Sequence, residues 1–92
     1  MRFVVLAMLT GCVAGPPAVT AQDAERAHLA LAELQQGRQL LVTKCGGCHN
    51  TPLPTDHTAQ EWPVKIDEMA TRAHLEADER RVISEYLVAM SR

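Results

Sequence analysis

The sequence predicts an all-α domain of three to four helices. Several stretches place apolar residues at three- and four-residue steps, which is the spacing of one helical face, and no stretch is convincing as a β-strand. The chain has 92 residues, 47% of them apolar and 3% aromatic, enough for one domain and little more. We therefore expect a small helical protein whose apolar core stabilises the fold only marginally unless a further apolar component enlarges that core.

The first 21 residues have the layout of an export signal. A short positive start at Met1 and Arg2 precedes an apolar run over residues 3–9, and Val19-Thr20-Ala21 offers small residues before a cleavage site. The apolar run is far shorter than the roughly 20 residues that a membrane-spanning helix needs. We predict an export signal over residues 1–21 and a folded domain over residues 23–92.

A second processing site competes with the first. Leu9-Thr10-Gly11-Cys12 resembles a bacterial lipobox, in which the cysteine becomes the lipidated first residue of the mature chain. Residues 1–11 would then be an unusually short lipoprotein signal, and residues 12–22 a flexible tether. Both sites stay open, and with them the choice between a free and a membrane-tethered protein.

The first predicted helix covers residues 23–43. Asp23 and Glu25 suit its positive N-terminal end. Its buried face would be formed by residues that recur at helical spacing, namely Ala30, Leu34, Gly37 and Leu41.

The second predicted helix follows a loop over residues 50–57 that contains Pro52 and Pro54. Thr58 and Glu61 match a capping box that opens the helix, which should end near Arg72. Pro63 falls just inside the helix, where a missing backbone donor is tolerated. Three apolar residues share the face behind it: Trp62, Ile66 and Met69.

The last predicted helix covers residues 77–90. Asp78 and Glu79 lie in its first turn, where acidic side chains are favourable. Its apolar stripe consists of Val82, Ile83, Tyr86, Leu87 and Met90.

Cys45-Gly46-Gly47-Cys48-His49 is the C-x-x-C-H pattern of covalent haem attachment. Two thiols separated by two residues on a helical turn can reach vinyl groups on neighbouring pyrroles, and the next residue then lies beneath the iron. The cysteines hold the ring, and His49 ligates the iron from one side.

Three other interpretations of the motif are weaker. A thioredoxin-like dithiol is expected beside a βαβ pattern, which is absent from the sequence. A zinc site needs a companion pair of ligands, but His57 and His74 are 17 residues apart. A disulfide between Cys45 and Cys48 would close a loop too small to stabilise the chain much.

The helix before the motif resembles the first helix of class I cytochromes c. Gly37, Leu41 and Cys45 fall at four-residue steps, and in that family the glycine lets the first helix cross the last one closely. The matching partners here would be Tyr86 and Leu87. The resemblance spans about residues 37–90 and implies a cytochrome c-like fold packed around one covalent haem c.

The resemblance also implies how the haem is held. Cys45 and Cys48 would carry it, and His49 would be the proximal iron ligand, donating its outer ring N–H to the carbonyl of Pro52 or Pro54. The sequence does not choose between the two prolines.

The distal ligand in this family is usually methionine, and Met69 is the candidate. It follows His49 by only 20 residues, whereas the family usually places the ligand some forty or more residues on. The geometry permits it, because residues 50–58 extend to about 30 Å, enough to round the haem edge, and the helix then rises to Met69. The alternatives are His74, His57, an open iron position, or Met69 as core filler beside Ile66.

These patterns predict a periplasmic electron carrier, free or lipid-anchored through Cys12, that works with redox partner proteins as a monomer or as a subunit of a redox complex. A net charge of −2 argues against nucleic acid as a partner. No catalytic constellation is recognisable, so we do not expect an enzyme. The alternative function is a haem-based binding or sensing module whose distal position opens to a small ligand.

Overall fold

The computed structural model describes residues 15–45 and 51–91 of the chain. Four α-helices run over Ala21–Ala27 (α1), Leu31–Leu40 (α2), Trp62–Ala73 (α3) and Ala77–Met90 (α4). A π-helical turn, Leu41–Cys45 (η1), continues α2, and a 3-10 turn, Pro54–Asp56 (η2), precedes α3. The described residues contain no strand, so the all-α prediction is confirmed for them.

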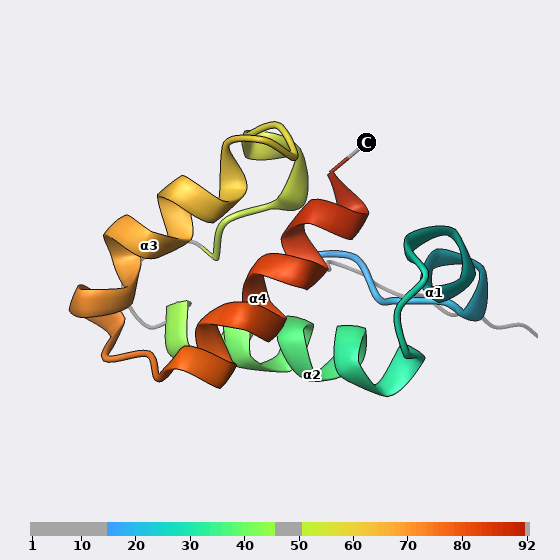
Figure 1. Ribbon diagram of the computed structural model, residues 1–92, viewed down its shortest axis with the longest axis horizontal. Coiled ribbons are helices and arrows are strands. Elements are labelled where there is room, and N and C mark those ends of the chain that lie inside the picture. Colours follow the sequence, from blue (N-terminus) through green and yellow to red (C-terminus); the bar gives the residue numbers. More distant parts are fainter. Residues whose placement is uncertain (1–14, 46–50, 92) are drawn as a thin grey trace, which may run out of the picture.

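Helix α4 is the centre of the arrangement. Both α2 and α3 pack against α4, while α2 and α3 approach each other little. Figure 1 shows α1 and α3 at opposite ends of the molecule, with η1 at the same end as α3. The paired helices α2 and α4 thus form the scaffold, and α3 packs against α4.

The core lies where η1, α3 and α4 meet. It consists of fully buried side chains, each of which stabilises the fold by roughly 1.5 to 3 kcal/mol or more through removal from water. They are Leu41, Trp62, Ile66, Ile83, Tyr86 and Leu87, referred to below as the core cluster. The predicted apolar stripe of α4 is confirmed, with Met90 only half-buried at its end.

The single helix predicted over residues 23–43 is divided in two. α1 ends at His28, which adopts the left-handed conformation with φ 58°. Its backbone N–H donates to Glu25 O, and that of Leu29 donates to Ala24 O at 3.1 Å, which closes the helix. Ala30, expected on the buried face, is instead an exposed residue just before α2. Histidine is among the residues that tolerate this conformation, but the period of the apolar residues does not reveal the break.

The capping box predicted at Thr58 is confirmed. The Thr58 N–H donates to Glu61 Oε1 at 2.9 Å, and the Glu61 N–H donates to Thr58 Oγ1 at 3.2 Å. The Thr58 backbone N–H holds the pKa of Glu61 below its usual range. α3 then begins at Trp62 with Pro63 in its first turn, and it ends at Ala73, one residue after the predicted end.

At Gly37, α2 and α4 approach each other closely. A Cβ atom at this position would overlap the carbonyl group of Val82 and lie 3.0 Å from Tyr86 Cβ. The expected close crossing with Tyr86 is thus confirmed. The other expected partner, Leu87, belongs to the core cluster, and the backbone of Val82 takes its place at the crossing.

Candidate haem site

Cys45 is the one residue of the attachment motif among those that the structure describes; Cys48 and His49 lie outside them. It ends η1, is half-buried and packs against the core cluster. Cys45 ends a π-helical turn, and such turns within α-helices are frequent at functional sites. The Thr43 hydroxyl donates to Gln39 O at 3.0 Å, capping a carbonyl of α2 within this turn.

An ion pair fixes η1 against the start of α4. Lys44 Nζ lies 3.5 Å from Glu79 Oε2. The pKa of Glu79 is lowered, first by the backbone N–H of Glu76 and then by Lys44. Both side chains are partly exposed, so the pair positions the turn more than it stabilises the fold.

Met69 lies on α3 and borders the same core cluster as Cys45. It is half-buried, and its neighbours Ile66 and Ala70 on the same helix are buried. The half-buried Leu75, just after α3, packs against the core cluster as well. Two sulfur-bearing residues, 24 positions apart in the sequence, therefore border one apolar cluster.

The alternative histidine ligands have different surroundings. His57 stacks edge-on against Trp62, with ring centroids 4.9 Å apart, and its Nδ1 lies 3.6 Å from Glu61 Oε1. His74 is exposed and ends α3 in the left-handed conformation, with φ 57°. His57 therefore contacts the core cluster through Trp62, whereas His74 lies at the exposed end of α3.

Trp62 fastens the proline-containing loop to α3. Its indole N–H donates to the carbonyl of Pro54 at 2.8 Å, and both residues are buried. The sequence indicated a core tryptophan but not this bond, because nothing local pairs position 62 with Pro54 rather than Pro52. Arg72, in contrast, is exposed.

Replacing Trp62 by Phe should destabilise the protein by about 2 kcal/mol. The smaller ring leaves the buried Pro54 carbonyl without its donor, and such a loss costs roughly 1 to 3 kcal/mol. Urea unfolding followed by far-UV circular dichroism measures the change. His57→Ala is the control, because it removes an edge contact with Trp62 and an exposed contact with Glu61 but no buried hydrogen bond, and should cost less. Equal losses in both variants would contradict the role of the indole N–H.

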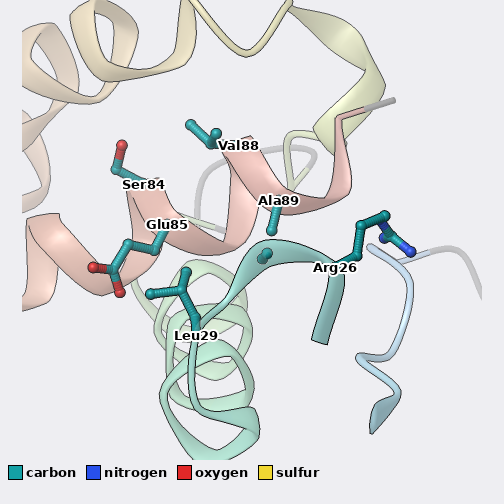
Figure 2. A pocket seen from close by; sticks show the side chains of 7 residues that line it. Arg26, Leu29, Ser84, Glu85, Val88 and Ala89 are labelled. Carbon is teal, nitrogen blue, oxygen red and sulfur yellow. The ribbon is translucent and has the colours of Figure 1, made fainter. Parts of the chain in front are cut away.

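A hollow on another part of the surface lies between α1 and α4 (Figure 2). Its lining includes Arg26, Leu29, Glu85 and Val88, and Figure 2 shows these side chains around it. Among the described residues, no cysteine, methionine or histidine lines it. The end of the molecule that carries Cys45 and Met69 is the better candidate.

Comparison with known proteins gives one informative similarity. Over 53 residues the chain is 36% identical to the cytochrome c-type protein TorY of Haemophilus influenzae. The match covers 58% of this chain and 14% of that protein, so this chain spans a small part of its relative. No family model and no solved structure matches. The similarity indicates a relation to c-type cytochromes.

Two further properties concern only residues 15–45 and 51–91. None of their helices is long and apolar enough to cross a membrane. Within these ranges, no three histidine, cysteine, aspartate or glutamate residues are gathered so as to hold a metal ion.

Proposed function

We propose that this protein is an electron carrier that holds one haem c covalently through Cys45 and Cys48, with His49 as the proximal and Met69 as the distal iron ligand. The observation that carries the proposal is that Cys45, which opens the C-x-x-C-H motif, and Met69 border the same core cluster. The partial similarity to a c-type cytochrome supports the same class of protein.

The residues present fit a haem. Around the core cluster lies a border of apolar side chains that are only half-buried, which suits contact with a large apolar ring. A domain of this size also gains from such a ring, because its own core cluster holds few large side chains. At the end of the molecule that carries η1 and α3, the border includes Cys45, Met69 and Leu75 (Figure 1).

Bound haem would supply an iron that gains and loses single electrons. The protein's part is to hold and orient the ligands. The Trp62 indole already donates to the carbonyl of Pro54, which keeps a second lone pair, so Pro52 and Pro54 both stay candidate acceptors for the outer ring N–H of His49. A hydrogen bond there would fix the orientation of the imidazole and raise its basicity as a ligand.

The surroundings of the histidines favour Met69 as the distal ligand. His57 is engaged with Trp62 and Glu61, and its use as a ligand would break both contacts. His74 is exposed and closes α3 in the left-handed conformation. Met69 is half-buried and packs against the core cluster that Cys45 also borders.

The location and partners follow from the same proposal. Covalent attachment in c-type cytochromes takes place outside the cytoplasm, which agrees with the export signal predicted over residues 1–21. We assign the protein to the periplasm, where other redox proteins would deliver and accept its electrons. With both axial positions of the iron occupied, no site for a substrate remains, so the protein would not act as an enzyme by itself.

Absorption spectroscopy of the mature protein tests the function. The reduced protein should have a low-spin c-type spectrum, and the oxidised protein should have the weak near-infrared band of methionine-to-iron ligation. A high-spin spectrum that shifts promptly on addition of carbon monoxide would contradict electron transfer and favour the ligand-sensing alternative.

A further inference from the structure

Residues 15–20, called the N-terminal strap below, are bound to the body of the protein. Pro16 is buried, and its carbonyl accepts hydrogen bonds from Arg38 Nε at 3.1 Å and Nη2 at 2.9 Å. The carbonyl of Pro17 accepts from Arg38 Nε at 3.1 Å and from the Tyr86 hydroxyl at 2.5 Å. Because Arg38 lies on α2 and Tyr86 on α4, the strap joins the two helices beside their crossing at Gly37.

The strap also begins α1. The Thr20 side chain and backbone form a capping box with Asp23, in which Thr20 N donates to Asp23 Oδ2 at 2.9 Å and Asp23 N donates to Thr20 Oγ1 at 3.2 Å. The Thr20 backbone N–H is the main cause that lowers the pKa of Asp23 to about 2. Val19 packs against the core cluster. The strap therefore makes hydrogen bonds to two helices, caps α1 and packs against the core cluster, as a part of the folded domain does.

Cleavage after Ala21 would remove every one of these contacts. The Tyr86 hydroxyl and the Arg38 guanidinium would lose their acceptors on the strap, and α1 would lose its capping residue. The new amino group at Gln22 would place a positive charge at the positive end of the α1 dipole, which is unfavourable. If the strap is retained, these hydrogen bonds and the cap of α1 are kept, and the unfavourable charge does not arise.

We propose that the mature protein keeps residues 15–20 as a structural strap and that export processing takes place upstream of Gly15 rather than after Ala21. Of the two sites in the sequence, the one before Cys12 leaves the strap intact. The folded domain then starts near Pro16 instead of residue 23. The inference rests on contacts of the strap and is independent of the iron ligands.

Mass spectrometry of the wild-type protein tests this inference. The full-length gene is expressed in a bacterium that matures c-type cytochromes, and the intact mass and the N-terminal peptide are determined in the soluble and membrane fractions. We expect peptides that contain Pro16 and Pro17, from a chain that starts at or before Gly15. A mature chain that starts at Gln22 would overturn the proposal.

Hydrogen exchange tests whether the strap is held as described. In full-length protein, Tyr86→Phe and Arg38→Gln should each speed the exchange of the Thr20 and Asp23 amides severalfold, because each variant loses a hydrogen bond to the strap. Arg72→Gln, a change of an exposed arginine on α3, should leave exchange unchanged. Equal exchange in all these proteins and the wild type would overturn the proposal.

Tyr86 offers a direct titration, since it is the protein's one tyrosine. Burial raises the pKa of Tyr86 to about 12. Because the folded pKa lies above the ordinary value of about 10, the neutral hydroxyl stabilises the fold below that pH, and this contribution disappears as the pH rises toward 12. The ¹³Cζ resonance of Tyr86 in the mature protein should stay in its protonated position at pH values around 10. Ionisation near pH 10 would contradict a buried hydroxyl that donates to Pro17.

Discussion

Replacing Met69 by Ala should lower both the reduction potential and the stability of the mature protein. The thioether favours reduced iron, so its loss should shift the potential downward within the span of roughly 0.8 V that axial ligands control. The proposed iron–sulfur bond would be absent from the unfolded chain and would contribute to folding, so the variant should also unfold at lower urea concentration. The near-infrared band should disappear, and the spectrum should become high-spin or indicate a recruited ligand.

Met90→Ala is a matched control for this experiment. Met90 is also a half-buried methionine that packs against the core cluster, but it lies at the end of α4. Truncation of either side chain should cost packing of up to about 2 to 5 kcal/mol, and only the Met69 variant should change the spectrum and potential. An unchanged spectrum in Met69→Ala would make Met69 core filler and direct the search to His74 and His57.

Replacing Gly37 by Ala should destabilise the protein by at least roughly 2 kcal/mol, although alanine is by about 1 kcal/mol the better helix former. The added methyl group would overlap the Val82 carbonyl, which belongs to the backbone of α4 and cannot rotate away. The two helices would have to separate, which would loosen Tyr86 in the core cluster and its bond to the strap.

Gln36→Ala provides the comparison for Gly37→Ala. Gln36 is the preceding residue of α2 and is exposed, so its replacement should change the free energy of unfolding by no more than about 0.5 kcal/mol. Urea unfolding followed by circular dichroism measures both variants. Equal stability of the two variants would mean that α2 and α4 do not cross closely at Gly37.

The features that the sequence predicted well are those encoded within a few neighbouring residues. The bounds of α4 agree with the prediction over residues 77–90, and the capping box at Thr58 and Glu61 forms with both hydrogen bonds. The approach of Gly37 to Tyr86 was also anticipated, from a family resemblance. The division of the first helix at His28 was missed, because one residue in the left-handed conformation leaves the apolar spacing on both sides nearly intact.

The sequence predicted some residues of the candidate haem site more firmly than others. The motif of Cys45, Cys48 and His49 is visible in the sequence because its chemistry requires fixed spacing, but only Cys45 falls among the residues that the structure describes. Met69 stays a prediction, now supported by its position beside the core cluster. The bond from Trp62 to Pro54 could not be foreseen, since two nearby prolines offer the same carbonyl.

By itself the sequence determined the all-α class, the bounds of the last helix and the attachment motif, because helical period, caps and fixed ligand spacing act over a few residues. Only the tertiary structure decided which distant groups meet. Tyr86 and Pro17 are 69 residues apart, and their hydrogen bond depends on how α2 crosses α4. A segment that looks like the end of a leader thereby becomes part of the fold, because its backbone carbonyls satisfy a buried hydroxyl and a guanidinium that no local pattern connects to it.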